Sequence, residues 1–422
     1  MRDVPHSLKK KFFFYLNQFA PFEKKPTLAV ALSGGPDSLA LLKLTAEWTK
    51  DHGGTVLALH VDHKLRPEST SEAKQVKKWC DDWGIKCHIL TWKHSTLTTK
   101  LQEQARKARY TLLEDSCKEQ GVLHLLVAHH KQDEQETLQM RHDKKSGPFG
   151  MAGISACLEK PFLRILRPLL NFTKDELLSV LENHPYLQDP SNENLKFHRA
   201  RLRTAPPEDL LPKDPVLRPL MEANLAVDLA TKVTLSESGW ASIDTSTLQN
   251  HLLWAHVLRS IGGKYYLPSQ TQIETLFKSL KNPDFTKTTC GGCTILKRNN
   301  TYVALREYGR VTAVSLTNKI PFLWDNRFWV SALAPAALTQ DISLGILGTK
   351  GWLQIKDKIS EPFFRESILT LPTLWQNGKA IEIPYLGILH QKSPLVYLHF
   401  QPLNAMLGQR FIALDVKEPA SK

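Results

Sequence analysis

Short apolar runs alternate with amphipathic stretches over the first two hundred residues. Five runs, each four to eight residues long and bounded by polar residues or glycine, predict buried strands at 28–32, 55–61, 87–92, 124–128 and 162–166. The stretches between them place apolar residues at helical spacing and predict helices over 39–50, 72–83 and 101–119. This alternation predicts an α/β fold with a doubly wound parallel sheet and helices on both faces.

Two short polar motifs predict where helices begin. Ser69 with Glu72, and Thr173 with Glu176, have the spacing of a capping box, in which each side chain bonds to the backbone N–H of the other residue. The second motif predicts a helix that ends near Glu182.

The pattern changes after residue 204. Residues 205–219 contain five prolines, which predicts a linker without regular structure. The first domain is therefore expected to span 1–204. Residues 220–308 are expected to be mainly helical and to end in a β-hairpin that turns at Asn299–Asn300. Residues 309–422 are expected to form a small mixed α+β domain.

Composition narrows the class of protein. Lys and Arg number 55 against 42 Asp and Glu, a net charge of +13, which favours a polyanionic partner such as nucleic acid. A hydrophobic fraction of 42% excludes a wholly disordered chain. No apolar run is long enough to predict a membrane span, and six cysteines fit a reducing compartment, so we expect a cytoplasmic protein. The sequence does not fix the oligomeric state, and an oligomer is possible.

The first predicted strand leads into a polar loop and then directly into a helix. The loop consists of Ser33, Gly34, Gly35, Pro36, Asp37 and Ser38. Glycines let the backbone approach a ligand, and the N–H groups at a helix start attract phosphate. The two serines can donate to phosphate oxygens, whereas Asp37 suits Mg²⁺ held between phosphates. The lysine of a Walker A motif is missing, so a different kind of ATP site is predicted.

This hexapeptide resembles the signature of the PP-loop ATP pyrophosphatases, which adenylate an oxygen atom of their substrate and release pyrophosphate. Further segments, in order, resemble the tRNA(Ile)-lysidine synthetases. They are residues 60–66, 105–110, 129–137, 167–170 and 189–192, with weaker landmarks at 291–293, 306–307, 324–328 and 371–375. The resemblance implies a sheet of the PP-loop type and covers nearly the whole chain.

The resemblance also implies a reaction. ATP with Mg²⁺ activates the wobble cytidine, position 34, of the isoleucine tRNA with a CAU anticodon. The cytidine O2 attacks the α-phosphate, pyrophosphate leaves, and an amine of free L-lysine then displaces AMP at C2 to give lysidine. The implied catalytic residues are Asp37, Arg106, Arg109, His129 and Asp133.

Each of these residues also has a structural interpretation. Arg106 and Arg109 can form a solvated helix face, and His129 can be a packing residue. The sequence leaves open whether His129 takes a proton from lysine or only positions it. Two replacements depart from the family pattern: Gln132 stands where a second aspartate is usual, and Lys145 stands where a glycine is usual.

Basic residues near this predicted site are expected to bind tRNA. They are Lys144, Lys145, Arg199 and Arg203, the last two within a dense basic segment at 196–203. Cys290 and Cys293 have no second cysteine pair, so a strand start is favoured over a metal site. Two alternatives remain: a PP-loop tRNA thiolase that uses a persulfide donor, and a non-catalytic RNA-binding relative, against which the intact loop argues.

Overall fold

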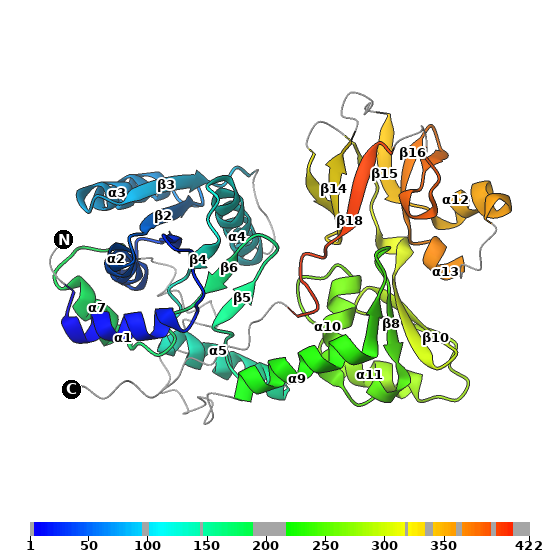
Figure 1. Cartoon of the computed structure of the whole chain (residues 1–422), viewed down its shortest axis with the longest axis horizontal. Coiled ribbons are helices and arrows are strands. Elements are labelled where there is room, and N and C mark those ends of the chain that lie inside the picture. Colours follow the sequence, from blue (N-terminus) through cyan, green and yellow to red (C-terminus); the bar gives the residue numbers. More distant parts are fainter. Residues whose placement is uncertain are drawn as a thin grey trace. The chain divides into compact units, whose positions relative to one another are not determined.

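The structure is a computed structural model of the 422-residue chain (Figure 1). It describes residues 4–94, 101–143, 147–188, 217–316, 320–333, 341–359, 365–389 and 394–407. The chain forms two compact units, one of Met1–Glu222 with Gln409–Lys422 and the other of Ala223–Gly408.

A six-stranded sheet forms the centre of the first unit. Its strand order is β3-β2-β1-β4-β6-β5, and all neighbours are parallel except β5, which runs antiparallel to β6 at the edge. The strands are β1 (Thr27–Ala31), β2 (Thr55–Asp62), β3 (Lys86–Thr91), β4 (His124–Leu126), β5 (Cys157–Glu159) and β6 (Arg164–Leu166). The predicted doubly wound parallel sheet is confirmed.

Helices cover both faces of this sheet. They are α1 (His6–Asn17), α2 (Pro36–Asp51), α3 (Ser69–Asp82), α4 (Leu101–Glu119), α5 (Lys131–Asp143), α6 (Pro148–Met151) and α7 (Lys174–Leu181). Successive residues of β1 point to opposite faces: Val30 packs in a core with α1, α2, α3 and α7, whereas Ala29 packs in a second core with α4. The sheet is therefore buried on both sides, as its continuous apolar strands require.

The two predicted capping boxes have different outcomes. The motif at Thr173 is confirmed, because its hydroxyl accepts from the Glu176 N–H and the Glu176 carboxylate accepts from the Thr173 N–H. The capping box predicted at Ser69 is wrong. The Ser69 hydroxyl instead donates to Asp62 at 2.9 Å, and Glu72 pairs with Arg66 at 3.0 Å, so both side chains are used elsewhere.

Helix α9 (Leu217–Lys232) begins inside the segment predicted as an irregular linker. Pro219 is the third residue of this helix, in the first turn, where the missing N–H would have no intrahelical partner. The prolines therefore do not exclude a helix up to residue 219, and that part of the linker prediction is wrong. Residues 205–216 lie outside the described part of the chain.

A five-stranded antiparallel sheet with helices α10 (His251–Ile261) and α11 (Gln270–Leu280) follows in the second unit. Its order is β7-β8-β11-β10-β9, with β7 (Val233–Leu235), β8 (Ala241–Asp244), β9 (Lys287–Cys290), β10 (Cys293–Arg298) and β11 (Thr301–Arg306). The predicted hairpin is confirmed as β10 and β11, turning at Asn299 with φ of 47°. Residues 220–308 thus contain a sheet in addition to the predicted helices.

Two smaller antiparallel sheets complete the second unit. Their orders are β12-β15-β16-β17 and β13-β14-β18. The elements are β12 (Val314–Ser315), β13 (Phe322–Trp324), β14 (Phe328–Ala332), β15 (Ile342–Ile346), α12 (Gly348–Ile355), α13 (Arg365–Ile368), β16 (Pro372–Gln376), β17 (Lys379–Glu382) and β18 (Val396–Phe400). Within the described residues, no helix has the length and apolar character needed to cross a membrane.

Candidate active site

The loop between β1 and α2 is tightly packed around Gly34. This glycine has a φ of +88°, a conformation that L side chains rarely adopt. A Cβ atom there would lie 2.6 Å from Leu187 Cδ1 and 2.7 Å from Val76 Cγ2. The Gly34 carbonyl also accepts a hydrogen bond from the Leu187 N–H at 2.9 Å. The loop therefore needs glycine at this position for both conformation and space.

The two serines of the loop have different surroundings. Ser38 is buried, and its hydroxyl donates to the Gly35 carbonyl at 2.9 Å and accepts from the Ser33 N–H at 3.1 Å. Ser33 is exposed, and its hydroxyl lies 3.0 Å from that of Ser38. Ser38 thus braces the loop from inside, while Ser33 is the serine open to a ligand.

Helix α2 begins immediately after the glycines. Gly35 is its N-cap, Pro36 its first residue, and Asp37 lies in its first turn. The first N–H groups of a helix have no intrahelical partners and carry the positive end of the helix dipole, so the junction suits an anion. The Asp37 side chain is about a quarter exposed, at 26%.

Two carboxylates converge on His130, which follows β4. The His130 Nε2 atom lies 3.6 Å from Asp37 Oδ2 and 3.6 Å from Asp133 Oδ2. Asp133 Oδ2 also accepts from the His130 backbone N–H at 3.0 Å, a contact that caps the start of α5. Strands β1 and β4 are neighbours in the sheet, so their carboxyl ends bring these three residues together.

Burial and neighbouring charges shift the pKa of His130 in opposite directions. Burial lowers its pKa, but Asp37 and Asp133 outweigh that effect, so the pKa is raised above its ordinary value. The Gln132 backbone N–H donates to His130 Nδ1 at 3.2 Å. Because this N–H can only donate, Nδ1 is the acceptor and the proton of the neutral ring is on Nε2, facing the carboxylates.

The predicted arginines of α4 share one aromatic partner. Their guanidinium carbons lie 5.2 Å (Arg106) and 5.4 Å (Arg109) from the centre of the Tyr110 ring. Burial raises the pKa of Tyr110, but Arg106, Arg167 and Arg109 outweigh it, and the pKa is lowered. Arginines with a common phenol partner form a cationic cluster, but Arg106 is exposed and Arg109 half-buried, so the solvated helix face stays an alternative for Arg106.

His129 lies beside a residue that the sequence marked only as a landmark. It is half-buried, and its Nδ1 atom accepts a hydrogen bond from Arg167 Nε at 3.3 Å. Sequence reasoning missed both Arg167 and His130 as members of the site. The sequence shows two adjacent histidines, His129 and His130, after the fourth strand. Only the backbone conformation after β4 decides which of the two rings faces Asp37.

Two other landmark residues have structural roles. The His60 Nδ1 atom lies 2.9 Å from the Leu32 carbonyl, which links β2 to the residue before the loop. Asp62, only 3% exposed, accepts from the Lys64 N–H and from the hydroxyls of Ser69 and Thr70. Burial raises the pKa of Asp62, but these hydrogen bonds outweigh it and lower the pKa. Asp62 therefore anchors the start of α3.

Cys290 and Cys293 are paired residues on either side of a tight turn. They face each other in the register of β9 and β10, with Gly291 and Gly292 at φ values of 60° and 79° between them. The structure supports the interpretation as a strand connection. In the described residues, no group of three or more His, Cys, Asp or Glu side chains could hold a metal ion.

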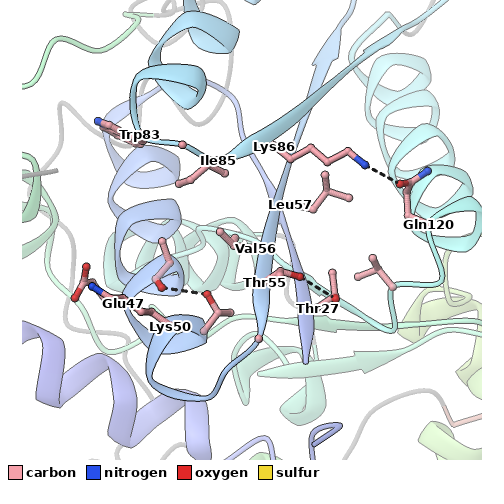
Figure 2. A pocket seen from close by; sticks show the side chains of 15 residues that line it. Thr27, Glu47, Lys50, Thr55, Val56, Leu57, Trp83, Ile85, Lys86 and Gln120 are labelled. Atoms are coloured by element: carbon pink, nitrogen blue, oxygen red, sulfur yellow. Dashed lines mark hydrogen bonds between the residues drawn. The ribbon is translucent and has the colours of Figure 1, made fainter. Parts of the chain in front are cut away.

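Four predicted tRNA contacts cannot be placed. Lys144, Lys145, Arg199 and Arg203 lie outside the described residues. Figure 2 shows an open pocket near the amino ends of β1, β2 and β3, with Thr27, Thr55 and Lys86 in its wall. None of the predicted site residues lines it, and ligands of parallel sheets bind at the opposite, carboxyl edge. This pocket is therefore not the candidate site.

The chain is similar in sequence to known proteins. A family model described as a PP-loop domain matches residues 7–208. The tRNA(Ile)-lysidine synthase of Wolbachia pipientis is 31% identical over 400 residues, which cover 88% of this chain and 89% of that protein. The enzyme of the same name from Wolbachia sp. subsp. Brugia malayi is 30% identical over 411 residues, covering 91% and 94%.

One solved structure that matches part of this chain is the U34-tRNA thiolase NcsA from Methanococcus maripaludis with its 4Fe-4S cluster. It is 20% identical, covers 46% of this chain and 70% of its own, and has a TM-score of 0.40. A likeness of that size does not bear on function.

Proposed function

Because the chain belongs to the tRNA(Ile)-lysidine synthase family, we propose that it uses ATP to attach free L-lysine to C2 of the wobble cytidine, position 34, in the isoleucine tRNA with a CAU anticodon. The cytidine O2 attacks the α-phosphate and pyrophosphate leaves. A lysine amine then forms a bond to C2, loses a proton, and displaces AMP to give lysidine.

One observation carries the proposal: the glycine loop, Asp37 and Asp133 meet at one edge of a PP-loop sheet. Full-length similarity to two enzymes of this name supports the choice of substrate. ATP would lie with its phosphates on the loop and on the first turn of α2, where Ser33 and the backbone N–H groups can donate to them.

The residues present fit Mg²⁺. Asp37 and Asp133 supply carboxylate oxygens that approach a common point at His130 Nε2. Magnesium commonly uses one or two protein carboxylates and completes its shell with substrate phosphates and water. Asp37 would hold the ion, with Asp133 as the second candidate. When bound, the ion would neutralise charge on the phosphates that leave as pyrophosphate.

The remaining charged groups would bind either the negative phosphate or the positive ammonium of lysine. Arg106 and Arg109 would stabilise negative charge on the α-phosphate during adenylation and AMP release. Asp133 would attract the lysine ammonium. Asp133 Oδ2 accepts from the His130 backbone N–H at 3.0 Å and lies 3.6 Å from His130 Nε2.

We assign tRNA binding to both units. Residues 1–204 would form the ATP-binding catalytic domain, and 220–308 and 309–422 would add tRNA contacts. Lys144, Lys145, Arg199 and Arg203 are proposed to contact the tRNA near the reactive cytidine. The net charge of +13 supports a polyanionic partner.

The test is incorporation of labelled lysine into the isoleucine tRNA with a CAU anticodon, together with AMP release. We expect both products with this tRNA and neither with the isoleucine tRNA whose anticodon is GAU, which lacks the wobble cytidine. Labelled sulfur entering tRNA would favour the thiolase instead. Binding of tRNA without any AMP would favour the non-catalytic relative.

A further inference from the structure

Arg167 connects two neighbouring strands at the carboxyl edge of the sheet. It follows β6 directly, and β6 pairs with β4, whose chain continues to His129. The Arg167 side chain is 8% exposed. Its Nη1 donates to the Ser155 carbonyl at 2.7 Å, and its backbone N–H donates to the Ala156 carbonyl at 2.9 Å. The first bond holds the guanidinium and the second holds the backbone that carries it.

The guanidinium of Arg167 also donates a hydrogen bond to an imidazole. Arg167 Nε lies 3.3 Å from His129 Nδ1. A guanidinium has donors and no acceptor, so His129 Nδ1 must accept and cannot carry a proton in this arrangement. The single proton of the neutral ring is therefore on Nε2. A second proton would place an imidazolium directly against a buried guanidinium.

The surroundings of Arg167 favour an anion. In the part of the chain that the structure describes, no carboxylate forms an ion pair with it. Its electrostatic neighbours include the Tyr110 phenol and two further arginines, Arg106 and Arg218, and it also interacts with the Glu134 carboxylate beyond ion-pair distance. A buried charge without a close ion pair is costly, so a negatively charged ligand at this wall would be stabilised.

From this geometry we propose that Arg167 is a positioning residue that holds His129 as the Nε2–H tautomer. His129 then donates a hydrogen bond to an anionic oxygen of the substrate and does not accept the proton of lysine. This proposal rests on the proposed function. The lysine proton passes instead to a carboxylate, as the C2–N bond forms and the bond from C2 to the departing AMP breaks.

The bond from Arg167 also limits the chemistry of His129. While it is intact, His129 has no nitrogen that can act as a base, because Nδ1 accepts from Arg167 and Nε2 carries the proton. The acid–base group of the second step is then a carboxylate.

Two substitutions at position 129 test the donor role with the full chain, ATP and the CAU-anticodon tRNA. His129→Gln places an amide N–H near the position of Nε2, whereas His129→Asn places it near Nδ1. We expect AMP release by His129→Gln to stay within about tenfold of the parent chain. We expect His129→Asn to lose about 10²–10³-fold, the usual effect of removing one donor to a developing oxyanion. Equal losses in both variants would overturn the donor role.

Spectroscopy tests the tautomer independently of activity. With ¹⁵N-labelled histidine, we expect long-range ¹H–¹⁵N correlations of the unsubstituted chain to show His129 with a bare Nδ1 and a protonated Nε2. Arg167→Lys keeps the charge but loses the Nε–H donor, so we expect a mixture of tautomers and a fall of about 10–100-fold in kcat. A proton on Nδ1 in the unsubstituted chain would refute the proposal.

The two proposals fail in different ways. If the chain does not incorporate lysine into tRNA, the proposed function is wrong, yet the ring spectrum still reports the tautomer. If lysine is incorporated but His129 carries its proton on Nδ1, only the role of Arg167 is wrong. Because the spectrum is taken on the unsubstituted chain, poor folding of a variant does not prevent this decision.

Discussion

Asp37 combines a structural and a chemical position. It lies in the first turn of α2, where a negative side chain stabilises the helix by about 0.3–1 kcal/mol, and it faces His130 at 3.6 Å. We predict that Asp37→Asn abolishes AMP formation because the carboxylate needed for Mg²⁺ is lost, while tRNA binding survives. AMP release and filter binding of labelled tRNA measure the two effects.

A matched control for this variant lies on the same helix. Asp51→Asn changes the last residue of α2, where the carboxylate pairs with Lys9 at 3.4 Å, far along the helix from the loop. We expect normal AMP release from this variant. If Asp37→Asn lost tRNA binding and AMP formation equally, Asp37 would be a structural residue.

Gly34 supports a second prediction, on stability. Gly34→Ala must adopt an unfavourable φ, at about 1–3 kcal/mol, and must also displace Leu187 and Val76. Gly53→Ala is the matched control, since Gly53 has a φ of +61° but no atom within 4 Å of the added Cβ. We expect the melting temperature to fall for both and clearly further for Gly34→Ala. Equal decreases would show that the loop has room for a side chain.

The sequence predicted the composition of the site better than its arrangement. Gly34 and Asp37 could be identified because a strand, a glycine turn and a helix follow one another directly in the chain. The roles of His129 and His130 could not be separated, since adjacent residues after a strand end differ only in the direction their side chains take. Arg167 becomes part of the site only because β6 lies beside β4, a pairing between segments 40 residues apart.

At the scale of elements, Asp62 fixes the start of α3 and gives a pH prediction. Its pKa is lowered in the folded chain, so its stabilising effect is complete above the ordinary value of 3.8 and is lost as the pH falls through the folded pKa. We predict that Asp62→Ala lowers the urea midpoint at pH 7, with a cost of about 1.5–3 kcal/mol. The difference in urea midpoint between this variant and the parent chain should become smaller at acidic pH.

The control for Asp62 is another aspartate of the same region. Asp81 is exposed at the end of α3 and pairs with Lys77 at 3.1 Å, an interaction of little net stability. Asp81→Asn should leave the urea midpoint nearly unchanged at both pH values. If the difference in urea midpoint between Asp62→Ala and the parent chain stayed constant with pH, the idea that Asp62 is an ionised, hydrogen-bonded carboxylate would be contradicted.

Elements with a strong local signal were predicted well, and those that depend on distant partners were not. The helix at 101–119 matches α4 to the residue because its amphipathic pattern is long. The Ser69 motif failed because Asp62, seven residues earlier, binds the hydroxyl that would have capped the helix. The predicted linker failed at its end because a proline is tolerated in a first helical turn.

The whole molecule must hold a large polyanion while it carries out chemistry at a small site. A net charge of +13 provides long-range attraction, which depends on salt, whereas the loop at β1 and α2 depends on local geometry. Affinity for tRNA and adenylation chemistry should therefore be separable by substitution. This separation is what allows the basic segment at 196–203 to be tested apart from the ATP site.

We predict that replacing both Arg199 and Arg203 with Ala weakens tRNA binding and flattens its dependence on salt. Each phosphate contact that is lost should reduce the slope of log K against log salt by about 0.7–0.9. Lys24 and Lys25 form the control pair, because they precede Pro26 and β1 at the amino edge of the sheet, opposite the loop. The affinity for labelled tRNA is measured from low to high salt for the parent chain, the arginine variant and the lysine control. If the slope of log K against log salt were unchanged in the arginine variant, Arg199 and Arg203 would not be part of the interface.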